Sequence, residues 1–296
     1  VYGAAAAGMR VMTSSSSPGI SLKTEGLSYI AGSDVPALVV NVQRGGPGLG
    51  GIQPSQSDYF QATKGGGHGD YRMIVLAPAS VQEIASLTGR AFDGADKYRT
   101  PAMILADGVV GQMMEKVVLP EQRPRRTEEE IRKQCPWATN GRKDLRKRNV
   151  VTSLELESAK MEIINERLQA RYREIEKNET RWEEIDVEGA DYLIVAFGSV
   201  ARICTKAKEL AAEKGIKVGI LRPITLWPFP EKVLSKAADK VKAFISVELS
   251  MGQMIEDIKL ATECKKNVHL CNRVGGMIPS PEQVLESIIS VDKEGK

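Results

Sequence analysis

The chain has 296 residues, 42% of them hydrophobic and 27% charged, and its formal net charge is +3. These values are ordinary for a folded globular protein and leave enough chain for one large domain or two smaller ones. The small net charge and the lack of aromatic residues interleaved with the basic ones argue against a nucleic-acid-binding protein, and no apolar run is long enough to cross a membrane.

Residues 1–118 alternate between segments with the composition of strands and segments with the periodicity of helices. We expect strands at residues 10–13, 37–42, 73–76 and 102–105, and helices at residues 21–33 and 81–97. Ser80 precedes the second helix, and Glu83 follows three residues later, which is typical of a capping box.

Residues 119–188 differ in composition and predict a charged connector. Proline and charged residues dominate residues 121–133, and a basic run follows at residues 141–148. We interpret this run as a solvated surface in preference to an anion site. Farther along, apolar residues recur with helical spacing in a charged background, which predicts one amphipathic helix packed on a domain or a partner. These apolar residues are Met161, Ile164, Leu168, Tyr172 and Ile175.

Residues 189–296 again alternate between strands and helices. We expect strands at residues 192–197, 217–221, 243–247 and 268–271, and helices at residues 199–214, 231–238, 252–262 and from 280 onward. Ser199 is expected to be the N-cap of the first of these helices, and Ser280 with Pro281 begins the last. Uninterrupted apolar strands separated by helices predict a parallel sheet covered on both faces, and therefore a doubly wound α/β domain at each end of the chain.

The most informative stretch is a long glycine-rich segment, residues 43–70, that follows the predicted strand at 37–42. A long connection at the end of a strand is the usual place for a binding site in an α/β protein, with a flexible surface loop as the alternative. Arg44 lies at the end of the strand among glycines, where a guanidinium can bind a carboxylate or phosphate through two parallel hydrogen bonds.

A run of serines at residues 14–17, followed by Pro18 and Gly19, lies between a predicted strand and a predicted helix. Its hydroxyl and backbone N–H groups either face a ligand or only cap the helix. The chain has neither a nucleophile elbow nor a classical dinucleotide or P-loop motif. Its four cysteines form no C-x-x-C pair, so we expect a reduced cytoplasmic protein that has no iron–sulfur cluster of its own.

Several long segments, in the same order along the chain, resemble the α subunit of 2-oxoacid:ferredoxin oxidoreductases. The resemblance is greatest to the 2-oxoisovalerate (3-methyl-2-oxobutanoate) branch, and the 2-oxoglutarate enzymes are near relatives. The segments are residues 11–19, 43–50, 54–58, 66–70, 222–230 and 248–254.

The resemblance implies an α/β fold of two domains and a connector. Residues 1–118 would form a thiamine-diphosphate-binding pyrimidine-type domain that is incomplete at its N-terminus, and residues 119–188 the connector. Residues 189–296 would form a domain like the C-terminal domain of transketolase, in which Arg222 and Glu248 are expected to have packing or interface roles.

The resemblance also implies an enzyme that decarboxylates a 2-oxoacid oxidatively to acyl-CoA and CO₂ and passes the electrons to ferredoxin. Thiamine diphosphate and Mg²⁺ would be shared with a β subunit that binds the diphosphate. The family's G-D-G motif for this metal site is absent, since Ala106-Asp107-Gly108 lacks the asparagine that should follow. Coenzyme A would accept the acyl group, and a γ subunit and a ferredoxin-like δ subunit would complete the hetero-oligomer and carry its iron–sulfur clusters.

By the same resemblance, Arg44 holds the substrate carboxylate, at the position where the residue pattern already predicts an anion-binding cation. The residues expected to contact the cofactor are Ser14, Ser15, Ser16, Ser17, Pro18, Gly19, Gly45 and Gly46. Lys64, His68 and Asp70 are further candidates near the same cleft, and no metal ligand is assigned to this chain.

In the family, a glutamate that activates the cofactor and a substrate loop precede the residue that matches Val1. We therefore expect an incomplete α subunit that is inactive alone. Three alternatives stay open at this point: a 2-oxoglutarate enzyme, a non-catalytic scaffold subunit, and a transketolase-like sugar enzyme. The last is disfavoured by the small number of histidines. A 2-oxoglutarate site needs a second basic group, and Lys64 is either that group or an exposed loop lysine.

Overall fold

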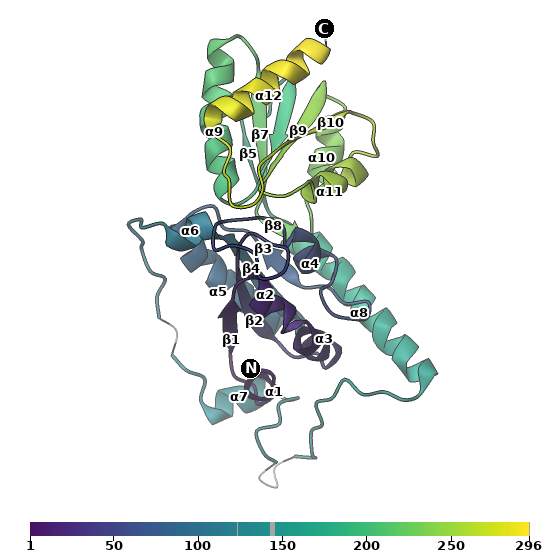
Figure 1. Ribbon diagram of the computed structural model, residues 1–296. Coiled ribbons are helices and arrows are strands. Elements are labelled where there is room, and N and C mark those ends of the chain that lie inside the picture. Colours follow the sequence, from purple (N-terminus) through teal and green to yellow (C-terminus); the bar gives the residue numbers. More distant parts are fainter. Residues whose placement is uncertain (123, 143–145, 296) are drawn as a thin grey trace.

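The computed structural model describes residues 1–122, 124–142 and 146–295 and contains two five-stranded sheets (Figure 1). The first sheet has the strand order β1-β2-β4-β3-β8. Its strands are β1 (Met12–Ser15), β2 (Ala37–Gln43), β4 (Pro101–Asp107), β3 (Ile74–Leu76) and β8 (Thr225–Trp227). The second sheet has the order β10-β9-β6-β7-β5. Its strands are β10 (Val268–Asn272), β9 (Ala243–Glu248), β6 (Tyr192–Val195), β7 (Val218–Pro223) and β5 (Trp182–Ile185).

Each sheet is parallel except at one edge, so the prediction of wholly parallel sheets is wrong there. In the first sheet, β8 pairs antiparallel with β3 and places Thr225 opposite Leu76. In the second sheet, β5 pairs antiparallel with β7. The strand β8 lies beyond the predicted boundary at residue 188, yet it belongs to the first sheet. This crossing links the two halves of the chain, and the predicted domain limits stay a prediction.

The helices cover the sheets as the alternating pattern predicts (Figure 1). The first half contributes α1 (Tyr2–Ala6), α2 (Ser17–Ser21), α3 (Thr24–Gly32), α4 (Tyr59–Thr63), α5 (Val81–Tyr98), α6 (Gly108–Gln112), α7 (Glu128–Gln134) and α8 (Ser158–Glu179). The second half contributes α9 (Ser199–Glu213), α10 (Glu231–Ala238), α11 (Met254–Ala261) and α12 (Pro281–Glu294). In the second sheet, α9 and α12 cover one face, and α10 and α11 the other. The part of the chain that the structure describes contains no helix long and apolar enough to span a membrane.

Strand β6 and the residues after it show how one strand serves two hydrophobic cores. Leu193, Val195 and Phe197 belong to a cluster that continues into the first sheet. Tyr192 and Ile194 belong to a separate cluster with α9 and α12. Side chains of a strand alternate between its faces, so a continuous apolar strand is required wherever both faces are buried. The predicted buried strand is thereby confirmed.

The amphipathic helix predicted in the connector is α8. Leu168, Tyr172 and Ile175 are buried against the first core, while Met161 and Ile164 are half-buried. The helix predicted at 21–33 is instead two helices, α2 and α3, and α2 has Pro18 in its first turn. A proline there costs no helical hydrogen bond, so the helical segment begins earlier than predicted.

Two predicted helix starts differ from the structure. The backbone N–H of Glu83 donates to Ser80 Oγ (3.1 Å), but the Glu83 carboxylate accepts from Ala79 N–H (2.8 Å) and from Arg222 (2.7 and 2.9 Å). The capping box is therefore only half formed, because Arg222 holds the carboxylate. The cap of α9 is Gly198, not Ser199, and its φ of +61° is a conformation that favours glycine.

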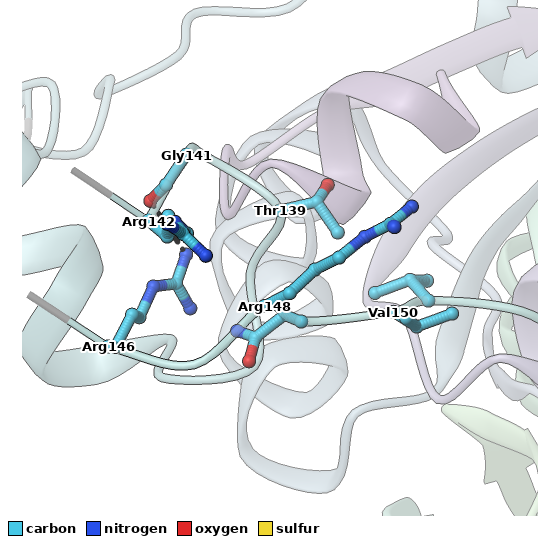
Figure 2. A pocket seen from close by; sticks show the side chains of 8 residues that line it. Thr139, Gly141, Arg142, Arg146, Arg148 and Val150 are labelled. Carbon is cyan, nitrogen blue, oxygen red and sulfur yellow. Dashed lines mark hydrogen bonds between the residues drawn. The ribbon is translucent and has the colours of Figure 1, made fainter. Parts of the chain in front are cut away.

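The basic run of the connector surrounds a cavity of about 400 Å³, where Figure 2 shows Arg142, Arg146 and Arg148 near Thr139 and Val150. The guanidinium of Arg146 donates to the carbonyl oxygens of Pro136, Ala138 and Gly141 and to Asn140 Oδ1. Arg146 therefore organises the loop around it. Lys143, Asp144 and Leu145 of this run lie outside the described residues.

Glu248 lies at the end of β9, where its fully buried carboxylate organises the start of α11. It accepts hydrogen bonds from the hydroxyl groups of Ser246 and Ser250 (2.7 Å each). It also accepts from the backbone N–H groups of Gln253, Met254 and Ile255 (2.9–3.0 Å). These contacts agree with the packing role expected of Glu248.

Replacing Glu248 with alanine is expected to lower the free energy of unfolding by about 3 kcal/mol, because several buried donors lose one shared acceptor. Urea unfolding followed by circular dichroism measures the change. Glu256→Ala is the matched control, since Glu256 is an exposed carboxylate on α11, the helix whose start Glu248 organises. A loss no larger than that of the control would contradict this role.

Candidate functional site

Residues 14–19, here called the serine loop, lie beside Arg44 because the strands that lead to them, β1 and β2, are neighbours. β1 and β2 are paired in parallel, so the segments that follow them leave the same edge of the sheet. The backbone N–H of Arg44 donates to Ser17 Oγ (3.1 Å), and that of Ser17 donates to Asn41 Oδ1 (3.1 Å). The two segments that the sequence predicts to form one site are thus joined directly.

The guanidinium of half-buried Arg44 is held by its own loop. Nε donates to Ser16 Oγ (3.0 Å), and Nη1 donates to the carbonyl oxygens of Leu49 (2.8 Å) and Gly51 (2.7 Å). Nη2 makes no hydrogen bond to any described residue. The predicted two-nitrogen grip on an anion is therefore not available in this arrangement, and Nη2 is the nitrogen that can donate to a ligand.

Residues 44–54, here called the Arg44 loop, form a tight turn that closes where Arg44 pairs with Pro54. The N–H of Gly51 donates to the carbonyl of Gly45 (2.8 Å). Gly50 has φ +59°, and a Cβ there would lie 1.9 Å from the Gly45 oxygen, so only glycine fits. This closed geometry argues against the alternative of a flexible surface loop.

Asp58 joins these segments, and it is not among the predicted site residues. Its Oδ2 accepts from Ser17 Oγ (2.6 Å) and from Asn41 Nδ2 (2.8 Å). Its own N–H donates to Gln43 Oε1 (3.1 Å). The sequence does contain one indication of this network. Asn41 is a polar residue between two valines in a strand, and a buried polar group needs a hydrogen-bond partner.

Gln56 links the same loop to the second sheet. This fully buried side chain donates from Nε2 to the Phe197 carbonyl (2.9 Å) and accepts at Oε1 from Leu249 N–H (3.1 Å). Asp107, at the end of β4, also links the first sheet to the second half of the chain, because its Oδ2 accepts a hydrogen bond from Ser199 N–H (3.1 Å). Both contacts place the strand ends of the second sheet against the site.

The remaining residues expected at the cofactor differ in their surroundings. Ser14 is exposed, and its carbonyl accepts from Lys23 Nζ (3.1 Å). A Cβ on Gly19 would lie 2.0 Å from Ser15 Oγ, which explains the glycine in the first turn of α2. Gly45 is buried and faces Gly275, while Gly46 is exposed. Ser15, Ser16, Ser17 and Pro18 are half-buried.

Lys64, His68 and Asp70 are not joined to Arg44 by any hydrogen bond or ion pair among the described residues. Lys64 forms an ion pair with Asp257 on α11, and Asp257 also accepts a hydrogen bond from the Tyr59 hydroxyl (2.6 Å). Burial, together with the neighbouring Asp257, raises the pKa of Tyr59 well above its usual value. His68 and Asp70 are exposed. The structure therefore favours the loop-lysine interpretation of Lys64 over a second substrate cation.

Two family descriptions match the chain. "Pyruvate flavodoxin/ferredoxin oxidoreductase, thiamine diP-binding" covers residues 1–183, and "Pyruvate:ferredoxin oxidoreductase core domain II" covers residues 190–284. The ketoisovalerate oxidoreductase subunit VorB of Methanothermobacter thermautotrophicus is 51% identical over 98% of this chain and 81% of its own length. The 2-oxoglutarate synthase subunit KorA of the same organism is 34% identical over 99% of this chain and 83% of its own length.

Two solved structures are also similar. The 2-oxoglutarate:ferredoxin oxidoreductase from Magnetococcus marinus, with 2-oxoglutarate, coenzyme A and succinyl-CoA bound, is 28% identical with a TM-score of 0.82. The match covers 100% of this chain but only 55% of that chain. An inactive β4 tetramer of a split-gene transketolase is 12% identical with a TM-score of 0.55, covering 96% of this chain and 76% of that chain, and shares the fold alone.

The Asp58 network leads to a test that needs no activity. In Asp58→Ala, Ser17 and Asn41 lose their common acceptor, so the amide hydrogens of Ser17 and Arg44 should exchange with solvent about tenfold faster or more. Hydrogen–deuterium exchange with mass spectrometry measures this. The control is Asp70→Ala, which removes an exposed carboxylate from the same glycine-rich segment. Equal protection in both variants would show that Asp58 does not hold the site together.

Proposed function

The chain belongs to the thiamine-diphosphate-dependent 2-oxoacid:ferredoxin oxidoreductases as an α subunit, and we propose that its substrate is 2-oxoisovalerate. The ketoisovalerate relative is 51% identical to this chain, and the 2-oxoglutarate relative 34%. The proposed reaction cleaves the bond between the carboxylate and the 2-oxo carbon and releases CO₂. The acyl group passes to coenzyme A, and the electron pair reduces ferredoxin.

The observation that carries the proposal is the placement of Arg44. Its guanidinium is oriented by Ser16 and by two loop carbonyl groups, while Nη2 stays available for an anion. A cation that is already oriented loses little conformational entropy when it binds a carboxylate. We therefore assign Arg44 the role of holding the substrate carboxylate and aligning the bond to be broken.

The residues beside Arg44 fit the aminopyrimidine half of thiamine diphosphate. The serine loop offers hydroxyl and backbone groups at the end of β1, and Ser16 and Ser17 also contact Arg44. Ser14 to Gly19, with Gly45 and Gly46, are the proposed contacts to the cofactor. When bound, the cofactor supplies the nucleophilic carbon and stores the electrons released by decarboxylation. The part played by this chain is to position substrate and cofactor.

The exposed face of the Arg44 loop supports a partner subunit over the site. Leu49 is 83% exposed and Ile52 is 78% exposed, and exposed apolar side chains beside a binding site are typical of an interface. We propose that a β subunit covers this loop and brings the diphosphate and Mg²⁺ site. No described group of three or more His, Cys, Asp or Glu residues could hold a metal ion. The iron–sulfur clusters, the γ and δ subunits and a cytoplasmic location belong to the same proposal.

The role of Arg44 predicts a loss of activity in the full-length subunit assembled with its partner subunits. Arg44→Ala should lower kcat/KM for 2-oxoisovalerate about 100-fold, since charge-assisted hydrogen bonds to the substrate are lost. Arg44→Lys should recover part of the loss, because it keeps the charge without the guanidinium geometry. Methyl viologen reduction, with coenzyme A, thiamine diphosphate and Mg²⁺ present, measures both.

Arg90→Ala serves as the matched control, because Arg90 is an exposed arginine on α5. Unchanged activity in Arg44→Ala would contradict the assignment and favour the scaffold alternative, in which this chain supplies no group needed for turnover.

The substrate is tested with the same assembled enzyme. We expect kcat/KM for 2-oxoisovalerate to exceed the values for 2-oxoglutarate and pyruvate by about tenfold or more. The second carboxylate of 2-oxoglutarate would lack a cation, and the small methyl group of pyruvate would leave an apolar pocket unfilled; each loss of binding free energy lowers kcat/KM on this scale. A preference for 2-oxoglutarate would mean that a cation other than Lys64 serves its second carboxylate, because Asp257 already pairs with Lys64. Reduction with none of the three acids would refute the proposed activity.

A further inference from the structure

A second cavity, of about 950 Å³, lies apart from the Arg44 site. Its walls come from the end of α4, from α8, from β8 and from the start of α10, and no residue of the serine loop or the Arg44 loop lines it. The elements α4, β8 and α8 meet where the two halves of the chain join (Figure 1). The volume is that of a cavity that binds a small molecule.

The walls of this cavity carry more basic than acidic side chains. Arg173 and Lys177 on α8 and Lys232 on α10 have no hydrogen-bond or ion-pair partner among the described residues. Lys64, on the same wall, is neutralised by Asp257. Arg173 and Lys177 are four residues apart on one helix face, where two like charges repel each other. A bound anion would relieve this repulsion. Glu176 on α8 and Glu231 on α10 also line the cavity and have no side-chain partner among the described residues, but the basic side chains outnumber the acidic ones.

Aromatic side chains also line the cavity. Trp182, Trp227 and Phe229 line it. The ring of buried Tyr172 packs edge-on against Trp227, with centroids 5.6 Å apart and an interplanar angle of 88°, and so fixes the orientation of the indole. Aromatic faces next to free cations suit a planar ring that carries an anionic group.

We propose that this cavity binds a nucleoside phosphate, with the base against the tryptophans and the phosphates on Arg173, Lys177 and Lys232. A single phosphate would leave the aromatic side chains without a partner, and a purely apolar molecule would leave the cations without one. This assignment does not depend on the proposed function of Arg44, since the two sites share no residue.

The cavity provides its own reporter, because two of the three tryptophans of the chain line it. Titration of the full-length chain with ADP should change the tryptophan fluorescence saturably. Adenosine, which has the ring alone, and inorganic pyrophosphate, which has the charge alone, should each bind about tenfold more weakly than ADP. Isothermal titration calorimetry gives the same affinities without relying on fluorescence.

Exposed cations are the residues to change, because their removal leaves the core intact. Arg173→Ala and Lys232→Ala should each weaken ADP binding about tenfold. The matched control is Lys116→Ala, which removes an exposed lysine outside the cavity and should leave the affinity unchanged. Absence of saturable ADP binding, or equal affinity in all three variants, would overturn the proposal.

Coenzyme A contains the same adenine and phosphate chemistry, so competition identifies the source of the ligand. If coenzyme A displaces ADP at a lower concentration than ADP itself requires, the site holds the nucleotide end of coenzyme A. If ADP stays bound, the site holds a free nucleotide. Either result supports the cavity as a nucleotide site, provided that Arg173→Ala weakens ADP binding about tenfold in the same assay; an affinity that this substitution leaves unchanged places the ligand elsewhere.

Discussion

The site depends on the carboxylate of Asp58. Its Oδ2 accepts hydrogen bonds from Ser17 and Asn41, and thereby fixes the end of β1 against the end of β2 at the start of α4. Gln56, two residues earlier, bonds to Phe197 and Leu249 and fixes the same loop to the second sheet. A short segment of chain thus determines where the serine loop, the Arg44 loop and the second sheet lie relative to one another. Removing such a shared acceptor leaves its donors without a partner, which is costly where they are shielded from water.

This arrangement places a constraint on Arg44. Three of its guanidinium N–H groups are already bonded to Ser16, Leu49 and Gly51, so a carboxylate that binds Arg44 as proposed must either use Nη2 or displace the loop carbonyls. The first choice keeps the loop closed, and the second opens it beside the exposed Leu49 and Ile52. A partner subunit that covers these side chains would favour the closed loop. Under the proposed function, substrate binding and subunit contact would therefore act on the same few residues.

The sequence predicts most of the fold because hydrophobic periodicity is a local property. The strands at β2, β6 and β9 and the helices α5, α8 and α12 follow it closely. What it does not predict depends on contacts distant in sequence. Strand β8, from the second half of the chain, pairs in the first sheet. Arg222 binds the Glu83 carboxylate, which therefore does not complete the capping box, and Lys64 pairs with Asp257. Arg44 is predicted from its glycine-rich surroundings, and its role stays a prediction; Asp58 is not predicted, because its contacts to Ser17 and Asn41 form only when β1 and β2 are paired.

The central claim, that Arg44 holds the substrate carboxylate within the frame set by Asp58, is tested most directly by a structure. The assembled enzyme should be determined with 2-oxoisovalerate bound under conditions that prevent turnover. We predict that the carboxylate lies about 3 Å from Nη2 of Arg44, with the Asp58–Ser17 hydrogen bond intact. A carboxylate bound by another cation, with the Arg44 guanidinium still directed only at Ser16 and its loop carbonyls, would contradict the account.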